Sequence, residues 1–190
     1  GALTVAASTG GTGSRRLGTS GRGNTLRCYG TLSIASQYIV YCSINNCTGN
    51  MTVNYHVYGS VECPNGTLYL YGNVGGNVRS WNTTYISGYV DGNLYVFADG
   101  KSVTTNSTVY GDVRIRGNYY QYGTVYGSLT VQGSYNPYNI YYFGGGLSVN
   151  GDLTLNFGSN YGSLGDNGYD INVTGTLTIN VDASYYVSVY

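Results

Sequence analysis

A five-residue phrase that begins with glycine recurs along the whole chain and limits the folds open to it. The phrase is Gly, a small polar residue, an apolar residue, any residue and a second apolar residue. Clear copies begin at Gly30, Gly49, Gly66, Gly92, Gly111, Gly127, Gly151 and Gly175, and looser copies begin at Gly1, Gly59 and Gly76. Alternation over the last three positions places two apolar side chains on one face of a strand, and the Gly-polar step supplies a bend. Each phrase therefore predicts a turn followed by a short strand.

The spacing of these phrases predicts stacked coils. The clear copies are 16 to 26 residues apart, which is near the length of one coil of a β-solenoid. A unit of that size cannot bury its apolar face alone, so each coil must stack on the next at a strand spacing of about 4.8 Å. We therefore expect an all-β chain, a β-solenoid of roughly eight or nine coils. The alternative is a β-sandwich completed by a donor strand, because short strands with frequent turns produce the same alternation.

The composition supports an all-β structure and argues against several classes of protein. The 190 residues include 31 Gly and 24 Tyr, and only 8% are charged, against about 25% in an average domain. Helix-favouring residues are scarce, so neither a helical bundle nor an α/β enzyme is expected. The net charge is zero, and the apolar runs are far shorter than the ~20 residues that span a bilayer. We expect no nucleic-acid partner and no membrane span.

The start of the chain is predicted to lie outside the single all-β domain, which we place at residues 26–190. Residues 7–25 are rich in Gly, Ser and Thr and are typical of a flexible linker. An isolated apolar strand before such a linker must be disordered, fold back, or complete a sheet in another subunit. The last arrangement is donor-strand exchange. The candidate donor strand lies within residues 1–6 and consists of Ala2, Leu3, Thr4, Val5 and Ala6.

Charges of opposite sign gather toward opposite ends of the sequence. The early charges are all positive, at Arg15, Arg16, Arg22 and Arg27. The charges after residue 151 are all negative, at Asp152, Asp166, Asp170 and Asp182. In a solenoid the sequence ends are also the physical ends. The predicted rod therefore has a positive head and a negative tail, which would orient head-to-tail contacts.

Four cysteines in one short stretch predict disulfides, because none has the spacing of a zinc site. Cys28 and Cys47 each stand two residues before a phrase glycine, so adjacent coils would place them one above the other. Their separation of about 4.8 Å suits a disulfide. We predict that Cys28 pairs with Cys47, which leaves Cys42 to pair with Cys63. A sandwich would more naturally pair Cys28 with Cys42.

Six Asn-x-Ser/Thr sequons are candidates for N-linked glycans, with ordinary turn chemistry as the alternative explanation. They lie at Asn46, Asn50, Asn65, Asn82, Asn106 and Asn172. The chain opens at Gly1 without Met, as expected for a mature chain after removal of a secretory signal. With disulfides and glycans, this predicts an extracellular or cell-surface location.

The repeats resemble those of bactofilins, polymer-forming β-helical proteins that assemble end to end without nucleotide. The resemblance covers roughly residues 58–155 and rests on phrases such as 109–113 (VYGDV), 125–129 (VYGSL) and 149–153 (VNGDL). Bactofilins are cytoplasmic and are not rich in Tyr, so the cysteines, sequons and tyrosines depart from that family. The combination is more similar to an extracellular filament subunit of a thermophilic archaeon, a class in which glycosylated β-proteins rich in Thr, Asn and Tyr are typical. Both likenesses imply a polymer-forming protein.

Catalytic residues are scarce, which favours a structural function. His56 is the only histidine, so a multi-histidine metal site cannot form and a Ser-His-Asp triad would have to use His56. We expect no enzyme activity and no cofactor. The leading hypothesis is a structural subunit of an extracellular filament or surface appendage, which polymerises head to tail with itself by β-strand pairing. The alternatives are a carbohydrate-binding adhesin or spike module and, with less support, a polysaccharide-acting β-solenoid enzyme.

Overall fold

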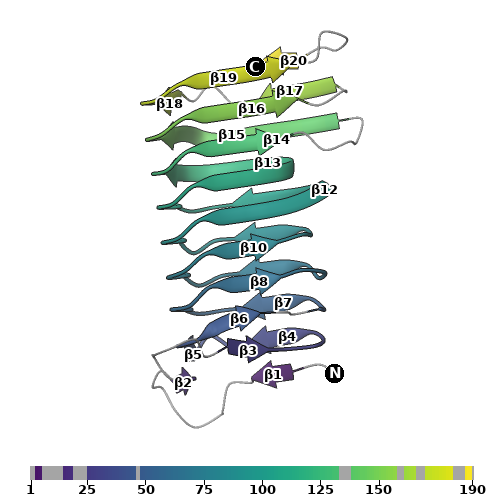
Figure 1. The fold of residues 1–190 in the computed structure, drawn as a ribbon, viewed down its shortest axis with the longest axis vertical. Coiled ribbons are helices and arrows are strands. Elements are labelled where there is room, and N and C mark those ends of the chain that lie inside the picture. The colour runs from purple at the N-terminus through teal and green to yellow at the C-terminus, as the bar shows by residue number, and fades with distance from the viewer. Residues whose placement is uncertain are drawn as a thin grey trace.

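The chain forms a stack of short strands without a helix. The computed structural model describes residues 3–5, 15–18, 25–45, 48–132, 138–157, 161–165, 170–181 and 187–189. Within these ranges every strand pairing is parallel. Eighteen strands belong to one curled sheet, and the coils lie one above another in a solenoid-like arrangement (Figure 1). The alternative of a β-sandwich does not fit, because sandwich strands pair antiparallel.

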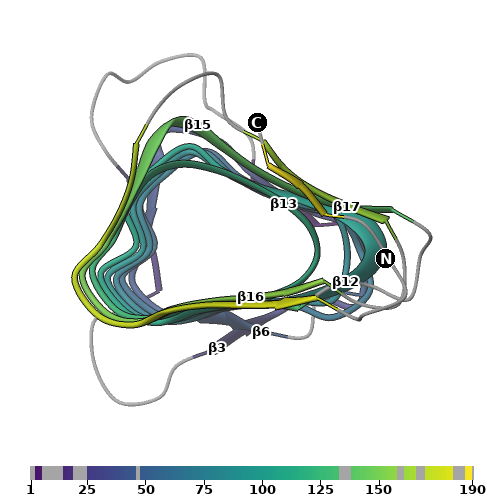
Figure 2. The same ribbon diagram turned by 90° about the horizontal axis from the view of Figure 1, so that it is seen from above.

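Each coil follows three faces, which we number in chain order, and seen along the stack the coils trace a rounded triangle (Figure 2). Face 1 contains β1 (Leu3–Val5), β4 (Leu32–Ile34), β7 (Met51–Val53), β9 (Leu68–Leu70), β11 (Thr84–Ile86), the second parts of β12 (Leu94–Thr105) and β13 (Val113–Val125), the first part of β15 (Tyr138–Val149), β17 (Tyr161–Gly165) and β20 (Val187–Val189).

Face 3 is built in the same way from the strands that follow the second corner. It contains β3 (Thr25–Arg27), β6 (Ser43–Asn45), β8 (Val61–Cys63), β10 (Val78–Ser80), the first parts of β12 and β13, β14 (Leu129–Gln132), β16 (Leu153–Phe157) and β19 (Leu177–Val181). Face 2 contains β2 (Arg15–Leu17), β5 (Tyr38–Val40), the ends of β13 and β15, and β18 (Ile171–Val173), joined by single bridged residues.

The core is a set of apolar ladders, one residue per coil, that run the length of the stack. Face 2 shows this most simply, since its inward position is almost always valine. Its ladder consists of Leu17, Val40, Val57, Val74, Val90, Val109, Val125, Val149 and Val173. The valines from Val40 to Val149 are at most 1% exposed. A β-branched side chain packs well on a pleated surface, so repetition of valine favours an unbroken column.

The corner between faces 2 and 3 is built by a glycine ladder and a polar ladder. Glycines stack at Gly59, Gly76, Gly92, Gly111, Gly127, Gly151 and Gly175. The residue after each glycine accepts, through its side chain, a hydrogen bond from the backbone N–H of the equivalent residue in the next coil, over separations of 16 to 24 residues. This polar ladder contains Ser43, Ser60, Asn77, Asn93, Asp112, Ser128, Asp152 and Thr176. Coils of different length thus share one corner.

The glycine phrases of the sequence belong to two corners, which the sequence alone did not separate. Gly30, Gly49 and Gly66 stack on one another between faces 3 and 1. The later clear copies and the looser ones at Gly59 and Gly76 stack between faces 2 and 3. The long interval from Gly66 to Gly92 is therefore a change of corner and not a longer coil.

One polar cluster lies inside the stack on face 1 and had no signature in the sequence. Tyr119, Gln121 and Thr105 are at most 1% exposed. The Tyr119 hydroxyl lies 3.1 Å from Thr105 Oγ1, and Gln121 Oε1 accepts from both hydroxyls. Gln121 Nε2 donates to the carbonyl of Ser107 at 3.1 Å. Burial raises the pKa of the Tyr119 phenol well above its usual range.

Candidate functional site

The two ends of the stack expose strand edges and apolar side chains. Among the described residues, β1, β2 and β3 each pair with one strand of the second coil. At the other end β18, β19 and β20 each pair with one strand below. Leu177 and Ile179 of β19 are 52% and 42% exposed, whereas Leu153 and Leu155, which they cover, are 0% exposed. These end surfaces are therefore the candidate site for assembly.

Opposite charges occupy the two end surfaces, as the sequence predicts for a coiled stack. Arg15 and Arg16 of β2 and Arg27 of β3 are exposed in the first coil. Asp152 and Asp170 are exposed and directly precede β16 and β18, which lie in the upper two coils of the stack (Figure 1). Arg22, Asp166 and Asp182 lie outside the described residues. The described charges thus give the stack a positive first end and a negative last end.

The candidate donor strand folds back on its own chain. Leu3–Val5 forms β1, which pairs in parallel with β4 in the register Leu3↔Leu32. The Leu3 N–H donates to the Thr31 carbonyl at 2.8 Å. Ala2 and Ala6 lie outside the described residues. Donation of this strand to a second subunit stays a prediction, and it would need β1 to leave β4.

The predicted linker contributes strands to the first coil. Arg15–Leu17 forms β2 on β5, and Thr25 begins β3 on β6. Residues 7–14 and 19–24 of that range lie outside the described residues. The predicted boundary at residue 26 therefore wrongly assigns residues 15–17 and 25 to the linker. The Gly-rich sequence around these residues contains no sign that their main chain pairs with strands of the stack.

Of the cysteines in the described residues, Cys28 and Cys63 lie near the corner between faces 3 and 1, and Cys42 lies near the corner between faces 2 and 3. Cys28, Cys42 and Cys63 are buried, and Cys47 lies outside the described residues, so the predicted Cys28–Cys47 bridge stays a prediction. The pairing of Cys42 with Cys63 finds no support. Gly59 stacks on Cys42, and Cys63 is four residues farther along the same coil. At about 3.3 Å per residue this exceeds the reach of a disulfide.

The sequon asparagines differ in the freedom of the nitrogen that would carry a glycan. Asn82 Nδ2 donates to the Asn65 carbonyl and Asn106 Nδ2 donates to the Tyr85 hydroxyl, both at 2.8 Å. Asn65 and Asn172 are exposed, and within the described part of the chain no hydrogen bond engages their side-chain amides. Asn50 is exposed and accepts from the Thr67 N–H at 3.0 Å. Asn46 lies outside the described residues.

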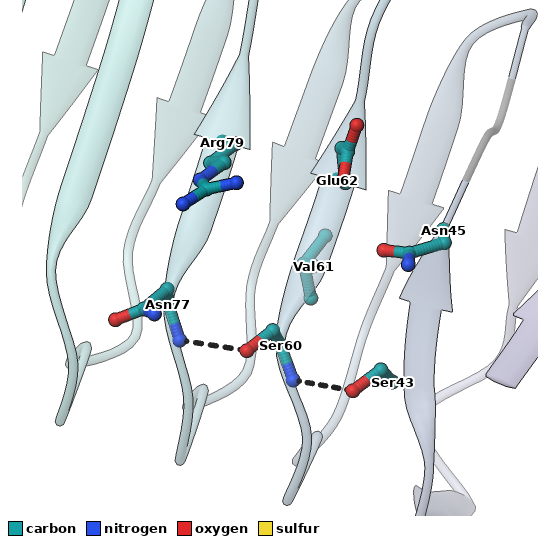
Figure 3. A pocket seen from close by; sticks show the side chains of 7 residues that line it. All are labelled: Ser43, Asn45, Ser60, Val61, Glu62, Asn77 and Arg79. Atoms are coloured by element: carbon teal, nitrogen blue, oxygen red, sulfur yellow. Dashed lines mark hydrogen bonds between the residues drawn. The ribbon is translucent and has the colours of Figure 1, made fainter. Parts of the chain in front are cut away.

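A polar cavity of about 270 Å³ lies on the outer side of face 3. Glu62 of β8 and Arg79 of β10 are directly opposed in the strand register and project from neighbouring coils over it (Figure 3). Its floor is the start of the polar ladder, where Ser60 N–H donates to Ser43 Oγ at 3.1 Å and Asn77 N–H donates to Ser60 Oγ at 3.0 Å. Asn45 and Val61 complete the lining.

As far as the described residues line it, the polar cavity of face 3 lacks the groups that a catalytic site would need. Glycoside cleavage by the usual route uses two carboxyl groups, and Glu62 is the one carboxyl group in the lining. The guanidinium of Arg79 faces the Tyr95 ring at 5.8 Å. In the described part of the chain no three His, Cys, Asp or Glu residues form a group that could hold a metal. We therefore assign no reaction to this cavity.

Comparison with known proteins found no matching family, no matching curated protein and no matching solved structure. Among the described residues, no helix has the length and apolar character needed to cross a membrane.

Proposed function

We propose that the chain is a β-solenoid subunit of an extracellular filament or surface appendage, and that it assembles head to tail with itself. The observation that carries this proposal is the pair of end surfaces. Each combines strand edges with apolar side chains, and the two have opposite charge. Exposed parallel edges are ready templates for pairing with another chain. Opposite charge favours contact of unlike ends over like ends.

The strand order specifies how two copies would meet. In the described residues face 1 has ten strand positions, from β1 to β20, whereas faces 2 and 3 have nine each. When β2 and β3 of a second copy stack on β18 and β19, β1 of that copy falls at the level of β20. Both strands cannot occupy this one position, so either β1 or β20 must be displaced from face 1 at the junction.

Strand exchange resolves this conflict, because β1 and β20 have the same pattern. Their sequences, Leu-Thr-Val and Val-Ser-Val, both alternate apolar, hydroxyl and apolar side chains. Either strand can therefore continue the face 1 column between two copies. Donor-strand exchange thus remains part of the proposal, with both strands as candidates for the donated position.

The extracellular location rests on chemistry that suits that environment. The exposed amides of Asn65 and Asn172 are open to glycan attachment. Only 8% of residues are charged, and hydrogen-bonded ladders of mostly neutral side chains join successive coils. The function proposed is assembly, without turnover of a substrate.

Electron microscopy and sedimentation of the purified chain test the proposal through a variant of β19. In a junction Ile179 becomes buried, so Ile179→Asp places an unpaired charge in an apolar contact. We expect the variant to raise the concentration needed for assembly by about tenfold or more, which corresponds to ~1.4 kcal/mol. Circular dichroism checks that it stays folded.

Thr178→Asp is the matched control, because it adds the same charge on the same strand at the alternate, outward-facing position. We expect this control to assemble like the unaltered protein. A chain that stays monomeric at all attainable concentrations, or equal assembly of the two aspartate variants, contradicts the proposal.

A further inference from the structure

An aromatic groove lies on the outside of the stack, where face 1 turns into face 2. It has a volume of about 360 Å³. Tyr55, Tyr58 and Tyr71 border it and are 41%, 54% and 48% exposed. The rest of the lining consists of Ile39, Asn54, His56, Gly72 and Asn73. Neither the proposed assembly surfaces nor the polar cavity of face 3 includes these residues.

Glycines in the fourth coil create the hollow. Gly72 stacks on the backbone of Tyr55, and Gly75 stacks on Tyr58 with its N–H donating to the Val57 carbonyl at 2.7 Å. The third coil therefore projects two tyrosines where the fourth coil projects no side chain. A Cβ at Gly75 would lie 2.9 Å from the Tyr58 carbonyl oxygen. Glycine therefore allows the two coils to stack closely at this position, and its lack of a side chain leaves the space beside Tyr58 open.

The aromatic rings are held by contacts with their neighbours. Tyr58 stacks on Tyr41 with ring centroids 4.8 Å apart and an interplanar angle of 22°. His56 meets Tyr58 edge-on at 4.3 Å. Tyr71 lies parallel to Tyr69 at 6.4 Å. Rings that are already ordered lose little conformational entropy when a ligand lies against them.

Two amide side chains bring hydrogen-bonding groups into the groove. Asn73 Oδ1 accepts from the Tyr89 N–H at 3.1 Å, which orients the amide and leaves both Nδ2 hydrogens for a ligand. Asn54 Nδ2 donates to the Ile34 carbonyl at 2.9 Å and leaves Oδ1 as an acceptor. The groove thus offers one fixed donor and one fixed acceptor beside three tyrosines.

We propose that this groove binds a neutral oligosaccharide. The lining, as far as the described residues form it, contains no Asp, Glu, Lys or Arg, which disfavours an ionic ligand. A sugar ring combines an apolar C–H face, which packs on an aromatic ring, with hydroxyl groups, which pair with amides and phenols. The mixture of open tyrosine faces and oriented amides matches both requirements.

Saturation-transfer NMR with defined sugars tests this proposal. The probes are cellotetraose, maltotetraose and mannotetraose, with tetragalacturonate as the charged comparison. We expect at least one neutral tetrasaccharide to bind the full chain at micromolar to millimolar concentration and the charged one to bind more weakly. Binding of none of the neutral probes at millimolar concentration, or preferential binding of tetragalacturonate, overturns the proposal.

Variants place the binding in the groove. Tyr58→Ala removes a bordering ring, and we expect roughly a tenfold loss of affinity. Asn73→Asp keeps the acceptor for the Tyr89 N–H and removes the two donors, so we expect severalfold weaker binding without loss of fold. Tyr126→Ala is the matched control, because Tyr126 is 49% exposed on the same face but lies outside the groove.

Equal affinity of the Tyr58→Ala and Tyr126→Ala proteins contradicts the proposal. So does loss of self-association in Tyr58→Ala alone, since that result would show that a second copy of the chain covers the groove. The test does not depend on assembly at the end surfaces, because Tyr58 lies in the third coil and β19 in the last described coil.

Discussion

At the scale of single residues, the stack depends on positions where no side chain fits. A Cβ at Gly111 would lie 2.6 Å from the Gly92 carbonyl oxygen. The neighbour on that side is the backbone of the coil below, which cannot move without separating the coils. Glycine is therefore required at this corner for close approach, with no need of an unusual backbone angle.

The buried phenol of Tyr119 leads to a prediction at this same scale. We expect Tyr119→Phe to lower the free energy of unfolding at pH 7 by about 1 kcal/mol, because the hydroxyl pairs with Thr105 and Gln121 in the core. Urea unfolding followed by circular dichroism measures the difference. Tyr126→Phe, at an exposed position, serves as the control and should change stability little.

The pH dependence of that difference has a definite sign. The folded state holds the pKa of Tyr119 above its unfolded value of about 10. The contribution of this group is fully present below pH ~10 and is lost as the pH rises further, because the unfolded chain then releases the proton more easily. The stability gap between the unaltered protein and Tyr119→Phe should therefore narrow above pH ~10. A constant gap between pH 8 and 11 would show that the phenol is not buried.

At the scale of elements, no strand is stable alone. Most strands have three residues, and each is held by parallel partners above and below, so stability comes from interfaces between neighbouring coils. An end strand has a partner on one side and is the easiest to displace. This distinguishes β1 and β20 from the other strands of face 1.

Deletions test the proposed exchange between these two strands. Removal of residues 1–7 lets β20 fill the contested position, and removal of residues 182–190 lets β1 fill it. We expect each single deletion to leave assembly intact and the double deletion to weaken it, because the face 1 column then lacks a strand at the junction. Electron microscopy and sedimentation measure the outcome. Loss of filaments in one single deletion, with normal filaments in the other, would identify that strand as the required donor.

At the scale of the whole molecule, the separation of charge gives the stack a direction. Arg15 and Arg16 are exposed at one end, and Asp152 and Asp170 near the other. Attraction between exposed charges is long-ranged at low ionic strength and is screened within about 8 Å at 0.15 M salt. Charge should therefore affect the rate of end-to-end encounter more than the strength of the finished junction.

Charge reversal tests this expectation. We expect the Arg15→Glu/Arg16→Glu protein to assemble more slowly than the unaltered protein at low salt, and the two rates to converge above ~0.15 M salt. Light scattering after the protein is diluted out of denaturant measures the rate of assembly. Arg114→Glu, in the middle of the stack, is the control. Equal rates for all three proteins at low salt would contradict a role for end charges.

The sequence by itself determined the class of structure, because its signals are local and periodic. The Gly-polar step and the apolar alternation at Gly111-Asp112-Val113 correctly predict a corner followed by an inward Val113, and their recurrence correctly predicts an all-β structure of short strands. These properties depend on neighbours in sequence, so they can be read without the fold.

Only the tertiary structure decided which phrase stacks on which. Gly66 and Gly92 begin copies of the same phrase but lie at different corners, since loops of different length can be placed at any corner without changing the phrase. The buried Tyr119, Gln121 and Thr105, and the groove between Tyr58 and Tyr71, come from residues on successive coils. Their contacts depend on register across coils, and a single chain's local pattern does not contain that register.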